Sequence, residues 1–180
     1  MLKNSNNGYG LISMLLHWLS AFTVIALFAL GLWMIELDYY SSWYKTAPHW
    51  HKSIGILLCA ATVIRVIFKW LQVTPKALGS KIENRAAHLA HFTLYALLIG
   101  LFVSGYLIST ADGRAIEVFN WFSIPASGKL FDNQEVIAGD IHKYIAYGLI
   151  GLATLHALAA LKHHFINKDN TLTRMITFNK

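Results

Sequence analysis

The sequence predicts an all-α integral membrane protein, built as an up-and-down bundle of four helices. Of its 180 residues, 56% are hydrophobic and only 13% are charged, whereas about 25% are charged in a typical soluble domain. Four apolar segments are each long enough to cross the hydrocarbon core of a bilayer, which takes about 20 residues. A chain of this length is expected to form one domain, over residues 1–180.

The bounds of the four predicted spans follow from their hydropathy. They cover residues 11–37, 51–71, 86–110 and 136–165. Pro48, Pro75 and Pro125 fall between these segments, as expected for uninterrupted helices. The first segment is longer than the apolar region of a secretory signal and no cleavage site follows it, so we interpret it as a span. The single Cys59 excludes a disulfide framework and a thiolate metal cluster.

The charges of the connections predict the orientation. The side with both chain ends and the second connection carries ten cationic residues: Lys3, Arg65, Lys69, Lys76, Lys81, Arg85, Lys162, Lys168, Arg174 and Lys180. The other side carries five, Lys45, Lys52, Arg114, Lys129 and Lys143, together with seven of the nine acidic residues. The positive-inside rule then places both termini in the cytoplasm. We therefore expect membrane lipid, and no nucleic acid, as the partner of the net charge of +6.

The connection over residues 111–135 is the longest one and lies on the outer side. It contains Trp121, Phe122 and Pro125. We expect it to fold back onto the outer membrane surface. There it would act as an interfacial cap, as a lid over an outer redox site, or as a dock for a partner.

Four histidines near the ends of the spans predict two cofactor sites. His142 and His156 lie fourteen residues apart, close to four helical turns or about 21 Å, so they point roughly the same way. In an up-and-down bundle, His51 lies level with His142 on the outer side, and His17 lies level with His156 on the inner side. Neutral imidazole is an axial ligand of haem iron, and helix bundles hold cofactors between their helices. The pattern predicts two haems b, since no Cys-x-x-Cys-His motif exists for covalent attachment.

Three cationic residues are candidate partners of the anionic haem propionates. Lys52 follows His51 and Lys143 follows His142, both at the outer level. Arg65, near the inner end of the second span, either serves the inner haem or extends to the lipid headgroups.

Four of the five remaining histidines allow two interpretations each, and we expect the fifth, His49, at the membrane interface. His88 and His91 either replace His17 or His156 as a ligand, or line a pocket near the inner haem. His163 lies on the same helical face as His156, seven residues later, and could donate a hydrogen bond to a quinone carbonyl. Alternatively, His163 and His164 face lipid headgroups.

These residues carry a resemblance to the bacterial cytochrome b561 family of four-helix dihaem membrane proteins, which is similar to the cytochrome b subunits of hydrogenases and formate dehydrogenases. The matching stretches span most of the chain and are residues 13–18, 51–55, 88–91, 141–156, 161–165 and 168–175. The last stretch has no generic explanation. The resemblance implies two haems b, with His17, His51, His142 and His156 as ligands, and residence in the bacterial inner membrane. It also implies quinone chemistry, including electron transfer from superoxide to ubiquinone.

The sequence therefore predicts an inner-membrane electron-transfer protein, an oxidoreductase that links a periplasmic-side donor or acceptor to ubiquinone. One alternative is a non-catalytic relay subunit for a separate dehydrogenase or a periplasmic redox partner. A second alternative is a histidine-lined metal or proton transporter.

Overall fold

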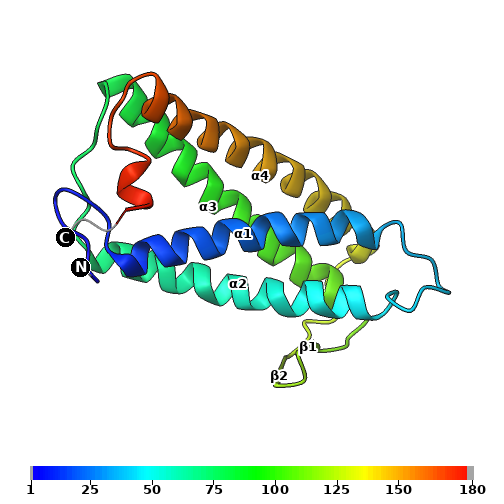
Figure 1. Ribbon diagram of the computed structural model, residues 1–180. Coiled ribbons are helices and arrows are strands. Elements are labelled where there is room, and N and C mark those ends of the chain that lie inside the picture. The colour runs from blue at the N-terminus through cyan, green and yellow to red at the C-terminus, as the bar shows by residue number, and fades with distance from the viewer. Residues whose placement is uncertain (1, 178–180) are drawn as a thin grey trace. The chain divides into compact units, whose positions relative to one another are not determined.

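The computed structural model describes residues 2–177 and contains four long helices (Figure 1). They are α1 (Leu11–Met34), α2 (Thr46–Leu71), α3 (Lys81–Thr110) and α4 (Gln134–Phe165). All four are long and apolar enough to cross a membrane. The prediction of an all-α chain with four spans is confirmed. Lys180, which entered the charge count, lies outside the described residues.

The helices leave most of their apolar side chains on the surface. Leu19, Phe92 and Leu155 are 63%, 71% and 63% exposed, for example. In water such a surface would drive association, whereas in lipid it is the expected outer face of a spanning helix. The exposed apolar surface therefore agrees with the hydropathy of the sequence.

Two helices begin five residues earlier than the apolar pattern predicts. Helix α3 starts at Lys81 because Ser80 and Glu83 form a reciprocal capping box: Glu83 N–H donates to Ser80 Oγ, and Ser80 N–H donates to Glu83 Oε2. Helix α2 starts at Thr46 and therefore contains Pro48. The prediction that every proline lies outside the helices is wrong, because a first-turn N–H has no partner in its own helix and proline costs little there.

The chain forms two compact units, and each long helix contributes to both. Unit 1 comprises Met1–Ala21, Ala61–Tyr95 and Gly151–Lys180, and unit 2 comprises Phe22–Ala60 and Ala96–Ile150. The prediction of a single domain stays a prediction.

Unit 2 contains a small hairpin that the sequence did not reveal. Strand β1 (Ile116–Val118) pairs with β2 (Phe122–Ile124) in antiparallel register. The buried Ser53 of α2 ties this hairpin down: its Oγ accepts from Phe119 N–H at 3.1 Å and donates to Glu117 O at 3.3 Å.

A buried amide joins the two ends of the long connection in unit 2. The side chain of Gln134, at the start of α4, is 1% exposed. Its Nε2 donates to Leu107 O near the end of α3, and its Oε1 accepts from Leu130 N–H. The amide thereby satisfies one of the carbonyls that a helix end leaves without a partner.

Candidate functional site

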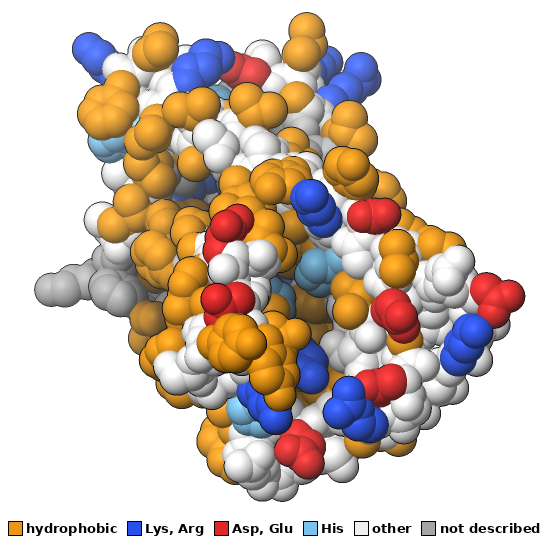
Figure 2. Space-filling view, turned by 90° about the vertical axis from the view of Figure 1, so that its right-hand side faces the viewer, with side chains coloured by type: hydrophobic (Ala, Val, Ile, Leu, Met, Phe, Trp, Pro, Cys, Tyr) orange, Lys and Arg blue, Asp and Glu red, His pale blue; other side chains and the backbone are white. Residues whose placement is uncertain are grey.

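In unit 2, the imidazole rings of His51 on α2 and His142 on α4 face each other. Their centroids are 6.3 Å apart and their planes are inclined by 66°. An imidazole nitrogen lies about 2 Å from a metal ion that it ligates, so two rings on opposite sides of one ion have centroids roughly 6 Å apart. The separation therefore suits an iron between the rings. Figure 2 looks onto one end of the molecule, where the surface is hollowed and histidine side chains are visible inside.

The contacts of His142 fix which of its nitrogens is free. Its Nδ1 lies 2.9 Å from Ser104 Oγ, and that hydroxyl donates in turn to Gly100 O at 2.7 Å. Because the hydroxyl proton is used, Oγ accepts from Nδ1–H. The lone pair of a neutral imidazole is then on Nε2, as metal ligation requires.

Within the described part of the chain, His51 Nδ1 makes no hydrogen bond to a neighbouring helix, although such a bond is the usual structural reason for a buried histidine. This nitrogen is buried and has no hydrogen-bond partner among the described residues. A buried polar atom without a partner costs free energy, about 1–3 kcal/mol. The usual structural role of an intramembrane histidine, a hydrogen bond to a neighbouring helix, is thus missing at this nitrogen.

Glycines on the other two helices make room for this pair. A Cβ atom at Gly31 of α1 would lie 3.4 Å from His51 Cε1, and one at Gly105 of α3 would lie 3.2 Å from His142 Cε1. Gly55, one turn after His51, differs: an added Cβ would meet no atom within 4 Å. Packing within the chain therefore does not explain Gly55, whereas a flat group beside His51 would.

In unit 1, His17 of α1 and His156 of α4 repeat the arrangement. Their ring centroids are 6.4 Å apart, with planes inclined by 70°. His91 of α3 also approaches His156, at 5.2 Å, which is shorter than the separation that a shared metal ion requires. The geometry therefore favours His17 over His91 as the partner of His156.

Arg65 contacts the His17 ring directly. Its Nη2 lies 2.9 Å from His17 Nδ1, and its Cζ lies 5.6 Å from the Tyr95 ring centroid. A guanidinium can only donate, so Nδ1 accepts and the proton of a neutral ring is on Nε2. Ligation through Nε2 would require Arg65 to leave Nδ1, and a propionate would offer it an anionic partner.

The structure places the other predicted residues as follows. Lys52 is half-buried, and its charge helps to lower the pKa of Asp112, after the hydrogen bonds that this carboxylate accepts from Arg114. Lys143 and His88 are exposed. His163 Nδ1 is hydrogen-bonded to Asp169 Oδ2 at 2.6 Å. The described residues hold no group of three His, Cys, Asp or Glu side chains suited to a metal ion without haem.

Sequence reasoning missed Ser104, Gly31, Gly105 and Asp169. Ser104 carries a usable signal, because a polar residue inside a span needs a partner. The two glycines carry none, since glycine is common in membrane helices.

Comparison with known proteins identifies this arrangement. The family model described as prokaryotic cytochrome b561 matches residues 8–178. The chain belongs to the prokaryotic cytochrome b561 family. Members of this family bind haem b and transfer electrons, and the chain is a multi-pass protein of the bacterial inner membrane.

Three relatives resemble the chain along nearly its whole length. Cytochrome b561 homolog 2 of Escherichia coli (strain K12) is 48% identical, over 96% of this chain and 93% of the relative. The probable superoxide oxidase CybB of Yersinia pestis is 31% identical, over 93% and 95%. Cytochrome b561 homolog 1 of Escherichia coli (strain K12) is 28% identical, over 97% and 99%. The predicted family is confirmed.

Proposed function

We propose that this cytochrome b561 carries electrons between a donor or acceptor at the outer membrane surface and a membrane quinone. His51 and His142 would hold an outer haem b, and His17 and His156 an inner one. The observation that carries the proposal is the presence of two imidazole pairs, each drawn from two spanning helices. Their centroid separations of 6.3 and 6.4 Å both suit one iron.

Haem b, when bound, supplies an iron that gains and loses one electron. The chain sets ligation, orientation and polarity around it. The hydrogen bond between His142 Nδ1–H and Ser104 Oγ leaves the lone pair of the neutral ring on Nε2, where it could bind the iron. Lys52 and Lys143 would serve the outer propionates, and Arg65 those of the inner haem.

Superoxide is the outer donor that the relatives favour, because one of them is named as a probable superoxide oxidase. Superoxide that gives up one electron leaves as dioxygen, so no further product needs a binding site. Stopped-flow mixing of the oxidised dihaem protein with superoxide tests this. Haem reduction within the mixing time, followed by re-oxidation when a ubiquinone analogue is present, is expected. Reduction by dithionite but not by superoxide would exclude this donor.

The quinone is proposed to bind in unit 1, near His163, with His88 and His91 in the same region. His91 lies 5.2 Å from His156, centroid to centroid. A quinone carbonyl needs a hydrogen-bond donor, and an imidazole can also transfer the proton that accompanies reduction.

Replacing His163 with alanine is expected to leave both haems bound and to slow their re-oxidation by a saturating ubiquinone analogue about tenfold or more. The physical reason is the loss of the proton donor. The measurement is haem absorbance after mixing pre-reduced protein with the analogue. The neighbouring His164→Ala is the control and should behave like the unmodified protein. An unchanged rate in His163→Ala would move the quinone site elsewhere.

Both chain ends are proposed to be cytoplasmic, because unit 1 carries the excess of cationic residues. Alkaline phosphatase fused after the last residue is therefore expected to be inactive, and a fluorescent protein there should fluoresce. A phosphatase inserted between Gly128 and Lys129, in the outer connection, should be active. The opposite pattern would reverse the labels inner and outer for both sites.

A second candidate function is a relay for a periplasmic redox protein docked on the hairpin. Trp121 and Phe122 favour it, being 72% and 47% exposed. Co-purification of a stoichiometric partner would support the relay, and superoxide-driven quinone reduction by the isolated chain would argue against it.

A further inference from the structure

The segment after α4, residues 166–177, is the closing segment of unit 1. It folds back onto two other parts of that unit. Trp18 Nε1 donates to Met175 O at 2.7 Å, and Arg174 Nη1 donates to Lys76 O at 2.8 Å. These bonds fix the closing segment but leave open why it carries an aspartate at residue 169.

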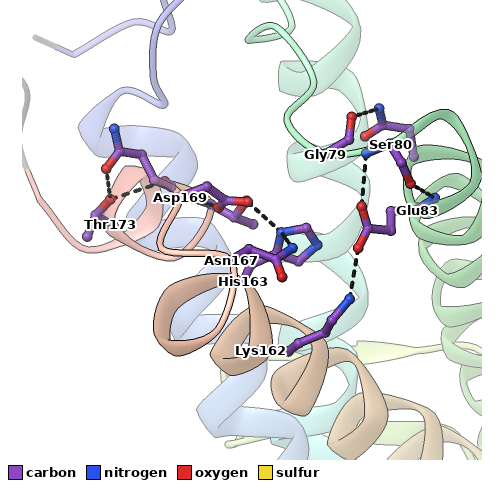
Figure 3. A network of polar contacts seen from close by, with 11 residues as sticks. Gly79, Ser80, Glu83, Lys162, His163, Asn167, Asp169 and Thr173 are labelled. Atoms are coloured by element: carbon purple, nitrogen blue, oxygen red, sulfur yellow. Dashed lines mark hydrogen bonds and ion pairs between the residues drawn. The ribbon is translucent and has the colours of Figure 1, made fainter.

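Asp169 is bonded to His163 (Figure 3). Its Oδ2 lies 2.6 Å from His163 Nδ1, and its Oδ1 accepts from Thr171 N–H at 2.8 Å. The side chain of His163 is only 14% exposed and that of Asp169 is 22% exposed. Burial raises the pKa of Asp169, but hydrogen bonds from Thr171 and His163 outweigh burial and hold that pKa below its ordinary value. Asp169 is therefore an ionised carboxylate near neutral pH.

An ionised carboxylate can only accept, so the proton of a neutral His163 is on Nδ1. Asn167 Nδ2, 3.2 Å from the same nitrogen, cannot then donate to it. The nitrogen left for a second partner is Nε2. A carboxylate that fixes the tautomer of an imidazole is also how serine hydrolases orient their general base.

Lys162 and Glu83 form a separate ion pair beside His163. Lys162 Nζ lies 2.8 Å from Glu83 Oε1. Gly79, with φ of 89°, lies between Glu83 and His163. An added Cβ would be 2.9 Å from Glu83 Oε2 and 3.2 Å from His163 Cε1. Figure 3 shows the two pairs beside each other. Because Glu83 is bonded to Lys162 and to Ser80, Asp169 is the acid that bonds to His163.

We propose that Asp169 is a positioning residue, which holds His163 with Nδ1 protonated and Nε2 directed to proton transfer with the quinone. This rests on the proposed role of His163. Reduction of a quinone to a quinol takes two electrons, which the cytochrome supplies, and two protons. For each proton, His163 Nε2 would first take up H⁺ from water, giving an imidazolium that the Asp169 carboxylate stabilises. It would then donate that proton to the quinone oxygen and return to the neutral Nδ1–H form. No bond to the protein forms.

Three substitutions test the proposal. Asp169→Asn removes the charge at nearly the same size, and Asp169→Glu keeps the charge on a longer side chain. Arg174→Gln is the matched control, because it removes another anchor of the closing segment without touching His163. Each variant is purified with its haems and pre-reduced, and its re-oxidation is followed at several concentrations of a short-chain ubiquinone analogue.

Asp169→Asn is expected to keep both haems and an unchanged KM for the analogue. Its maximal rate should fall about tenfold, which is part of the roughly 10²–10⁴-fold that a positioned acid–base side chain contributes. Asp169→Glu should be faster than Asp169→Asn but slower than the unmodified protein. Arg174→Gln should have the rate of the unmodified protein. Nitrogen NMR of ring-labelled histidine, with His163→Ala to assign the signal, should show the Nδ1–H tautomer, and Asp169→Asn should lose that preference.

Several outcomes would overturn the proposal. If Asp169→Asn re-oxidises as fast as the unmodified protein while His163→Ala is slow, that result excludes a positioning role of Asp169 and leaves the proposed function intact. Equal losses in Asp169→Asn and Arg174→Gln assign a merely structural role. A fast His163→Ala, or no re-oxidation by quinone in the unmodified protein, overturns the proposed function as well. If Asp169→Asn holds no haem, Asp169→Glu decides: a normal haem content with the Nδ1–H tautomer lost and the rate unchanged contradicts the proposal.

Discussion

Replacing His142 with alanine is expected to remove one of two haems and to leave the other in place. Its ring lies 6.3 Å from that of His51, and loss of either ring would leave a haem iron held there with a single protein ligand. The pyridine haemochrome assay against protein mass should fall from about two haems per chain to about one. His51→Ala should give the same spectrum as His142→Ala, whereas His17→Ala and His156→Ala should both remove the other haem.

His49 provides a matched control for this experiment. It lies on α2 two residues before His51, and its ring contacts Phe119 at 6.1 Å between centroids. His49→Ala should therefore keep both haems. A ratio near one haem in the unmodified protein would contradict the dihaem proposal. Loss of a haem in His91→Ala but not in His17→Ala would reassign the inner ligand.

Replacing Ser104 with alanine is expected to weaken haem retention at the same site by about 10–100-fold, the usual effect of removing the hydrogen-bond partner of a ligating imidazole. Ser104→Ala removes the hydroxyl that accepts from His142 Nδ1–H, so the tautomer preference and the fixed orientation of the ring are both weakened. Haem transfer to apomyoglobin measures the loss, and the midpoint potential of that haem should shift while that of the other stays constant.

Ser20 of α1 is the control for Ser104. It is also buried, at 5% against 3%, and its Oγ likewise donates to the carbonyl four residues earlier, Leu16 O at 2.6 Å. No histidine contact with Ser20 Oγ is found in the described part of the chain. Ser20→Ala should therefore leave retention and both potentials unchanged. Equal effects of the two substitutions would mean that only helix packing is affected.

The sequence predicted what depends on hydropathy and helical spacing. The four spans are confirmed because lipid demands long apolar helices, whatever their detailed packing. Two pairs of imidazole rings lie together, as their matching levels in the bundle predicted: His51 with His142, and His17 with His156. Their roles as ligands stay predictions.

The details that depend on particular contacts were not predictable. The hairpin forms because Ser53 offers one hydroxyl to two backbone groups 64 and 66 residues away, and no local pattern reports such a pairing. The contact of Arg65 with His17 likewise joins two helices through side-chain conformation alone. Asp169 lies in the matching stretch 168–175, but its partner His163 is found only when the chain turns back.

The buried amide of Gln134 has a consequence for how this family can diversify. By bonding to Leu107 O and Leu130 N–H, it brings the two ends of the connection between α3 and α4 together at one point in unit 2. A loop closed at its base can be lengthened or exchanged at small entropic cost, about 0.6 kcal/mol for each doubling of its length. Insertions between Ala111 and Lys129 should therefore leave α3 and α4 in register. Selection can then change the length and sequence of this connection without altering the helices that carry the histidines.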